Sequence, residues 1–126
     1  MYQPLNGIRI LDLSRLAPRP YLTQLLADLG AEVIKIETPT AGDYARLVPA
    51  QMGLGKMFDM INQGKKSVAI NYRNPLGREV FHRLVTTADV VLENFRPGTA
   101  ARWKMDYESL RVIKPDLIYC ALTGYG

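Results

Sequence analysis

The stretch LDLSRLAPRPYLTQLLADLGAEVIKIE, residues 11–37, predicts a strand, a loop, a helix and a second strand in direct succession. Leucines recur at helical spacing in its middle, and Gly30 is placed to end the helix. This is the layout of a nucleotide-binding βαβ unit. However, the loop that would hold glycines to receive a phosphate holds Pro18, Arg19 and Pro20. Because proline has no N–H to donate, this loop does not predict a backbone anion nest.

The same alternation continues along the chain. The runs SVAINY, DVVLEN and DLIYCAL predict three more strands, over residues 67–72, 89–94 and 116–122. Strands that alternate with helices predict an α/β fold with a mainly parallel sheet and helices on both faces.

Helix signals stand between these strands. Asn74 and Pro75 predict the N-cap and first residue of a helix. The apolar residues expected on its inner face are Leu76, Val80, Phe81, Leu84 and Val85. A helical turn after Gly98 and a helix over residues 106–114 are expected before the last strand.

The connection from Thr38 to Lys66 is too long for a simple link and is rich in glycine and proline. We interpret it as a functional loop, with one helix over residues 55–63. The run GLGKM from Gly53 lacks the spacing of a phosphate-binding loop, so we do not expect it to bind phosphate.

Length and composition fit one globular domain. A chain of 126 residues with 48% apolar and 22% charged residues has an ordinary globular composition. No apolar run approaches the roughly 20 residues of a membrane span and the N-terminus resembles no signal peptide, so we expect no membrane contact and a cytoplasmic location. The net charge of +4 comes from scattered basic residues, so no nucleic-acid partner is expected.

Cys120 and His82 are the single cysteine and histidine. Cys120 lies in the apolar run LIYCAL, which predicts a buried structural thiol. One histidine without a cysteine cluster does not form a metal site, so no metal is expected.

In open parallel sheets ligands collect beyond the carboxyl ends of the strands. The predicted strand ends place four arginines at that edge: Arg15, Arg19, Arg73 and Arg96. The amide of Asn94 and the phenyl ring of Phe95 stand at the end of the predicted strand over residues 89–94. Together with the arginines, they suit a ligand that carries phosphates and a heterocycle. The alternative to a ligand-binding role is that these arginines are solvated and bind nothing, and this alternative stays open here.

Four motifs resemble the opening of the family III CoA-transferases: PLNGIRILDLSRLAPRPYLTQLLADLGAEVIKIE, NQGKKSVAINYRNPLGREVF, ADVVLENFRPGTAARW and LIYCALTGYG. This family includes formyl-CoA transferase, carnitine CoA-transferase and bile acid-inducible CoA-transferases, and α-methylacyl-CoA racemase is a close relative. The resemblance implies a Rossmann-like large domain, a smaller domain and two interlinked subunits. Residues 1–126 would form the N-terminal part of the large CoA-binding domain, with the remainder outside this chain.

The resemblance also implies a mechanism. In the transferases an aspartate attacks the acyl-CoA thioester and carries CoA as an aspartyl-CoA thioester, whereas the racemases move a proton with a histidine and an aspartate. Both sets of residues follow the TGYG motif, so no catalytic residue is assigned within this chain. CoA or acyl-CoA is implied as a substrate rather than a permanently bound cofactor, a carboxylic acid as the acceptor, and a homodimer as the full-length assembly. A racemase, a non-catalytic CoA-binding or assembly module, and an unrelated nucleotide binder stay open as alternatives.

The family's CoA contacts carry over to eight positions: Leu16, Ala17, Pro18, Ile70, Arg73, Asn94, Phe95 and Arg102. A basic contact after KIE in some members would fall on Thr38 and is lost here. Lys65 and Lys66 match a basic pair of the family, but we expect them at the opposite edge of the sheet.

Arg19 stands where the family has glycine. A glycine there would allow a close backbone approach or a positive φ, whereas arginine could narrow the CoA site or add a phosphate contact. If φ at Arg19 is positive, the substitution costs about 1 kcal/mol.

Overall fold

The structure, a computed structural model, describes residues 2–47 and 56–124. Its elements are β1 (Arg9–Asp12), α1 (Pro18–Asp28), β2 (Glu32–Glu37), a 3₁₀ helix η1 (Tyr44–Leu47), α2 (Met57–Met60), β3 (Lys66–Ala69), α3 (Pro75–Val85), β4 (Val90–Glu93), α4 (Thr99–Arg102), α5 (Tyr107–Ile113) and β5 (Ile118–Ala121). The first three residues of the GLGKM run, Gly53 to Gly55, lie outside the described residues. None of the described helices is long and apolar enough to cross a bilayer.

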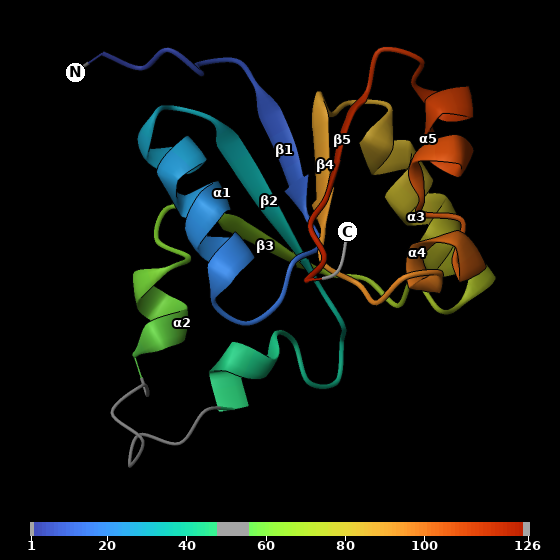
Figure 1. The fold of residues 1–126 in the computed structure, drawn as a ribbon, viewed down its shortest axis with the longest axis horizontal. Helices are drawn as coiled ribbons and strands as arrows, with labels where there is room; N and C mark the ends of the chain where they lie inside the picture. Colours follow the sequence, from blue (N-terminus) through green and yellow to red (C-terminus); the bar gives the residue numbers. More distant parts are fainter. Residues whose placement is uncertain (1, 48–55, 125–126) are drawn as a thin grey trace.

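The five strands form one parallel sheet in the order β3-β2-β1-β4-β5. The chain runs outward from β1 through β2 to β3, and then crosses to β4 on the other side of β1. Figure 1 shows α1 and α2 on one face of the sheet, and α3, α4 and α5 on the other. The predicted α/β fold is therefore confirmed. In this Rossmann-like order the point where the chain reverses direction lies between β1 and β4, which is where such folds bind ligands.

The two faces of the sheet are packed differently. Toward α3 and α5, a large apolar cluster includes Leu11 and Val91 from the central strands and Phe81 from α3, all fully buried. Toward α1 the apolar cluster is small, and its buried members are Ile10, Ala31 and Val33. Polar and charged side chains fill the remainder of the space under the first turn of α1, close to the carboxyl ends of β1 and β2.

Helix α3 begins at the predicted cap, because Asn74 Oδ1 accepts a hydrogen bond from the N–H of Leu76 at 2.9 Å. Its buried stripe is narrower than predicted. Phe81 and Val85 are buried, but Leu76 is 72% exposed. In the first turn of α3 the residue on the inner side is Gly77 instead. A Cβ atom at Gly77 would lie only 2.0 Å from the carbonyl oxygen of Asn71. Glycine thus permits a close approach between helix and loop.

The third strand ends earlier than predicted. β3 stops at Ala69, and the next residues form a turn in which Tyr72 N–H donates to Ile70 O at 3.0 Å and Asn74 N–H to Asn71 O at 3.0 Å. Short-range turn bonds therefore replace the expected strand ladder. In the long connection the predicted helix is the single turn α2, and η1 was not predicted.

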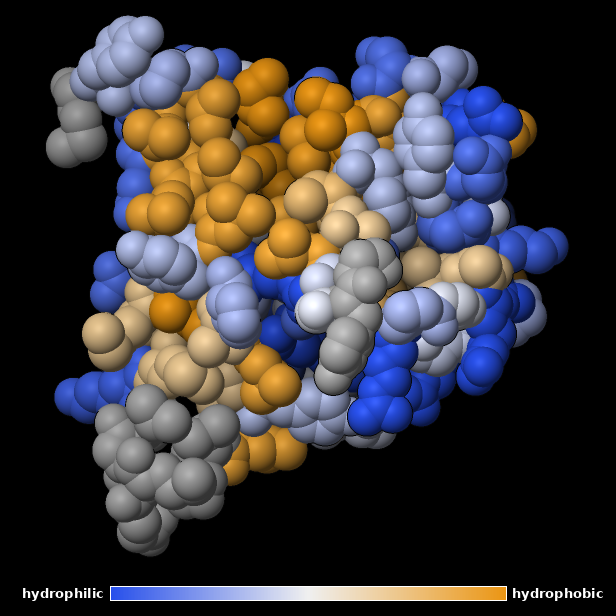
Figure 2. Space-filling view, viewed as in Figure 1, coloured by the Kyte–Doolittle hydropathy of each residue, from blue (hydrophilic) through white to orange (hydrophobic). Residues whose placement is uncertain are grey.

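An apolar surface lies over α1 and β5. Leu25 and Leu29 on α1 are 43% and 44% exposed, and Ile118 and Leu122 at β5 are 63% and 41% exposed. Figure 2 shows apolar residues gathered from α1 across toward β5 on this face. The leucines that indicated a helix in the sequence are thus partly turned toward solvent.

Candidate functional site

Arg15 lies at the centre of the site. It follows β1, and its guanidinium lies 5.5 Å from the ring centroid of Tyr44 and 5.8 Å from that of Phe95. It also donates a hydrogen bond to the hydroxyl of Tyr72. Two rings attract the cation and the hydroxyl fixes its direction, so the side chain of Arg15 is held at the carboxyl edge of the sheet.

Two cavities meet at Arg15 and Tyr44. The first cavity, of about 430 Å³, lies beyond β2 and β3, and its other lining residues are Thr38, Pro39, Thr40, Ala41, Gly42, Asn71 and Arg73. The second cavity, of about 390 Å³, lies beyond β1 and β4, and its other lining residues are Leu16, Asn94, Phe95, Arg96, Thr99 and Trp103. Together they form an elongated site with cationic and aromatic walls.

Aromatic packing shapes the second cavity. Phe95 stands edge-on to Trp103 with 5.7 Å between ring centroids, and Tyr72 lies 5.2 Å from Trp103. Arg73 places its guanidinium 5.4 Å from the Trp103 ring. Phe95 is therefore half-buried and supports the wall of the site.

The loop between β1 and α1 contains the strained residue, but it is not Arg19. Leu16 has φ +64°, whereas Arg19 lies inside the first turn of α1 with an ordinary negative φ. The helix begins at Pro18, so Arg19 is its second residue. The condition for a costly substitution, a positive φ at Arg19, is therefore not met, because the left-handed residue comes before the helix begins.

Asp43 holds this loop from the η1 side. Its Oδ1 accepts hydrogen bonds from the N–H groups of Leu16 and Ala45, both at 2.9 Å. Its Oδ2 lies 2.8 Å from Nζ of Lys35, and both side chains are almost completely buried. Lys35 Nζ also donates to the carbonyl of Ser14 at 2.9 Å. A buried ion pair thus ties the loop after β2 to the loop after β1.

Lys65 anchors the first turn of α1. Its Nζ donates to the carbonyl of Pro20 at 2.8 Å and to Thr23 Oγ1 at 2.7 Å, and it lies 3.3 Å from Asp12 Oδ2. Burial lowers the pKa of Lys65 to about 8. The expectation that this ammonium lies at the opposite edge was wrong. Lys66 does reach that edge, where it pairs with Glu32 at the start of β2.

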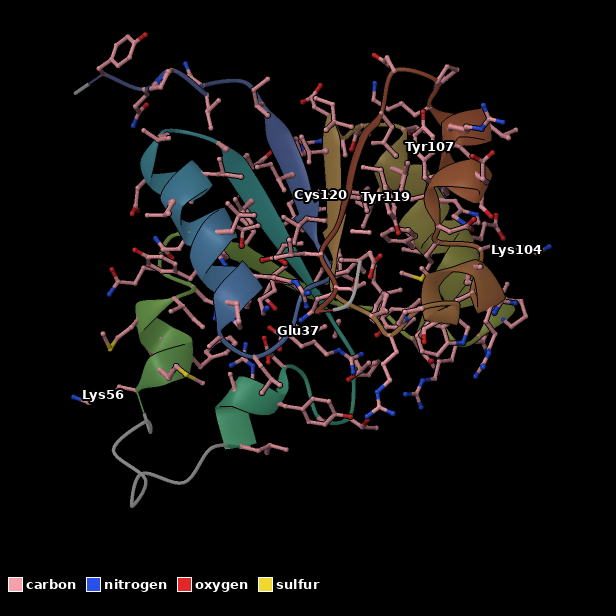
Figure 3. The ribbon with its side chains drawn as sticks, in the orientation of Figure 1. Glu37, Lys56, Lys104, Tyr107, Tyr119 and Cys120 are labelled. Carbon is pink, nitrogen blue, oxygen red and sulfur yellow. The ribbon has the colours of Figure 1, made fainter. Side chains whose placement is uncertain are left out.

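Glu37 lies at the end of β2 (Figure 3), and its carboxylate organises the loop that follows. Its carboxylate accepts two hydrogen bonds from Arg46, at 2.8 and 2.7 Å, and one from the N–H of Asp43 at 2.9 Å. Burial alone would raise the pKa of Glu37, but these bonds and one from Ser67 lower it to about 2. Gly42 fits closely here, since a Cβ at this position would lie 2.5 Å from Glu37 Oε2.

Cys120 is half-buried rather than enclosed. Tyr119, labelled beside Cys120 on β5 in Figure 3, packs against the apolar cluster on the α3 and α5 side. Because successive side chains of a strand alternate between faces, Cys120 lies on the other side of the sheet. The predicted buried thiol thus lies on the face where the apolar surface is open.

The eight predicted CoA contacts are only partly brought together. Leu16, Asn94 and Phe95 line the second cavity and Arg73 lines the first. Ala17 and Pro18, at the start of α1, and the exposed Arg102 on α4 line neither cavity, and Ile70 is buried in the core. No sequence signal points to Tyr44 and Trp103, because only the folded loops bring these rings to the cavities that meet at Arg15.

The fold and site define a doubly wound α/β protein with an elongated, cationic and aromatic cleft at its switch point. A family profile described as CoA-transferase family III matches residues 5–126. The chain belongs to this family.

Relatives and solved structures agree with this assignment. The succinate–glutarate CoA-transferase of Agrobacterium fabrum is 44% identical over 98% of this chain and 33% of its own length. The human succinyl-CoA:glutarate CoA-transferase is 42% identical over 98% of this chain and 29% of its own length. A CAIB/BAIF family protein from Brucella suis superposes with a TM-score of 0.92 at 42% identity, over the whole of this chain and 35% of that one. The chain therefore spans about a third of the length of the proteins it matches.

Proposed function

We propose that this chain is the CoA-binding N-terminal part of a family III CoA-transferase, which moves CoA between an acyl-CoA and a carboxylic acid. The observation that supports this proposal is the pair of cavities that meet at Arg15 along the carboxyl edge of the sheet. CoA is long, carries phosphates and ends in a heterocycle, and such a ligand matches arginines and aromatic rings along a cleft.

The proposed contacts follow the two cavities. Arg73 binds a phosphate at the nucleotide end, while Leu16, Asn94 and Phe95 contact the pantetheine arm, and Arg15 lies between these regions. Ala17, Pro18 and Arg102 are proposed contacts at the margins. Ile70 acts by packing, since its side chain is 5% exposed.

The proposed reaction uses an aspartate beyond residue 126. Its carboxylate attacks the thioester carbonyl, the C–S bond breaks, CoA leaves as a thiolate, and a mixed anhydride of the acyl group and the aspartate remains. The thiolate then attacks the aspartyl carbonyl, which releases the first acid and forms an aspartyl-CoA thioester. The acceptor carboxylate repeats the two steps in reverse and regenerates the aspartate. The residues of this chain bind and orient CoA and make no covalent bond to it.

The proposal also concerns the domain organisation of the full-length protein. Residues 1–126 are the N-terminal part of the large domain, and the remainder of that domain and a small domain lie outside this chain. The support is that the chain covers only about a third of each relative. The full-length protein is proposed to be a cytoplasmic homodimer that uses CoA as a substrate and holds no permanent cofactor. Glutarate, which both relatives' names contain, indicates a carboxylic acid as the acceptor.

Thermal unfolding with added CoA tests the binding site. CoA at a hundred times its Kd stabilises the folded state by about 2.7 kcal/mol, which raises Tm by several degrees in a chain of this size. Arg73→Gln should lose most of this shift, whereas Arg83→Gln, on the exposed side of α3 and outside both cavities, should retain it.

Three results would contradict the proposal. One is the absence of a shift at millimolar CoA, and another is a larger shift with NAD than with CoA. Transfer of CoA from succinyl-CoA to labelled glutarate by residues 1–126 alone would place the nucleophile inside this chain, against the proposed mechanism.

A further inference from the structure

A third, smaller cavity continues the cleft beyond β4 and β5. Its volume is about 160 Å³, and its lining residues are Arg19, Asn94, Phe95, Arg96, Pro97, Thr123 and Gly124. Three of these, Asn94, Phe95 and Arg96, also line the second cavity, so the two cavities share a wall. The volume is too small for a nucleotide and suits a chain of a few carbon atoms.

Arg19 brings a guanidinium group to this cavity. Its Nε is buried and has no hydrogen-bond partner, and its side chain forms no ion pair within residues 2–47 and 56–124. Glu93 lies close enough for Arg19 to lower the pKa of that carboxyl, but burial outweighs this and raises it. Glu93 Oε2 accepts a hydrogen bond from Phe95 N–H at 2.6 Å instead. A buried guanidinium N–H without an acceptor is costly, and a bound acceptor would remove that cost.

The order of the cavities follows the order of the strands. The first lies beyond β3 and β2, the second beyond β1 and β4, and the third beyond β4 and β5. On the proposed function, CoA lies with its nucleotide in the first cavity and its pantetheine arm in the second. An acyl group on its sulfur would then extend into the third.

We infer that the third cavity binds the distal carboxylate of a short dicarboxylic acyl group, with Arg19 as its main partner and Arg96 as a second cation at the rim. The planar guanidinium fork matches a carboxylate in two parallel hydrogen bonds. An acyl chain that ends in a methyl group leaves Arg19 Nε without an acceptor, so the cavity discriminates against it. This inference rests on the proposed function, because CoA must occupy the first two cavities to deliver the acyl group.

Calorimetric titration with succinyl-CoA, butyryl-CoA and free CoA tests it. The two acyl groups both have four carbons and differ in the distal group, a carboxylate or a methyl. We expect the chain to bind succinyl-CoA at least tenfold more tightly than butyryl-CoA. Arg19→Gln should abolish this preference, Arg19→Lys should keep part of it, and neither should change the affinity for free CoA more than about twofold. Arg83→Gln, away from the cleft, should keep the full preference.

The possible results distinguish failure of the proposed function from failure of this inference. If the chain does not bind free CoA, the proposed function fails and this inference fails with it. If it binds CoA but does not distinguish succinyl-CoA from butyryl-CoA, only this inference is overturned. A preference that survives in Arg19→Gln would also overturn it. If circular dichroism shows that Arg19→Gln does not fold, Arg96→Gln provides the second variant. In Arg96→Gln the preference for succinyl-CoA should be reduced, and an undiminished preference would contradict the role of Arg96.

Discussion

The carboxamide of Asn94 bonds to both backbone polar groups of Arg15. Asn94 Oδ1 accepts from the N–H of Arg15 at 2.9 Å, and Asn94 Nδ2 donates to the carbonyl of Arg15 at 2.9 Å. A side chain thus replaces the neighbouring strand at the point where β1 and β4 have ended. The predicted ligand-binding asparagine therefore also builds the wall on which the ligand would lie.

Asn94→Ala should destabilise the fold. The substitution leaves the N–H and carbonyl of Arg15 without these partners, which should cost about 1–3 kcal/mol. It should also weaken CoA binding, since Arg15 loses its fixed position. Urea unfolding gives the change in free energy, and Gln63→Ala at an exposed position is the control. An unchanged urea midpoint in Asn94→Ala would show that the loop does not depend on these bonds.

Lys35 and Asp43 should be strongly coupled. Lys35→Met leaves the carboxylate of Asp43 buried without its cation, and we expect a cost of about 3–5 kcal/mol. Asp43→Asn alone leaves the ammonium unpaired in the same way. The double variant Lys35→Met/Asp43→Asn should lose clearly less than the sum of the two, as measured in a double-mutant cycle by urea unfolding. Additive losses would indicate two independent contacts.

Leu16→Gly should not destabilise the protein. Leu16 has φ +64° and is 46% exposed, so glycine removes the left-handed strain and little packing. We expect a gain of up to about 1 kcal/mol in unfolding free energy. The neighbouring Ala17→Gly, at φ −95°, is the matched control and should cost about 0.5–1 kcal/mol. Equal losses in the two variants would contradict strain at Leu16.

Glu37 should make stability fall in acid. The pKa of Glu37 is about 2 in the folded state and 4.5 as its ordinary value. Because the folded value is the lower one, this stabilisation is present above pH 4.5 and is lost as the pH falls toward 2. In Glu37→Gln this part of the pH dependence should disappear, a difference of about 3 kcal/mol across that window. Urea unfolding at pH 6, 4 and 2.5 measures it, and a constant difference between the proteins would refute it.

The α/β fold could be predicted because its signals are local. Alternating apolar runs indicated each strand, and Asn74 with Pro75 marked the start of α3. The errors came where the backbone packs closely against a neighbouring loop. Gly77 took the inner position of the first turn because the helix approaches Asn71, which no periodicity indicates.

The site could be predicted only in outline. Strand ends placed Arg15 and Arg73 at the correct edge, since parallel strands share one carboxyl edge. The sequence could not show that Lys35, inside a strand, is buried against Asp43, because a lysine there usually faces solvent. It also could not locate the positive φ, which lies at Leu16 and not at the residue that departs from the family pattern.

The side chain of Arg15, held between Tyr44 and Phe95, divides the cleft into two halves that are built by different loops. Residues at the ends of β2 and β3 form one half, and residues after β4 and β5 form the other. Changes on one side therefore need not disturb the other. On the proposed function, a protein designer could retain the half that receives the nucleotide end of CoA and exchange a few residues near β5 to change the acid preference, and natural divergence could follow the same modular route.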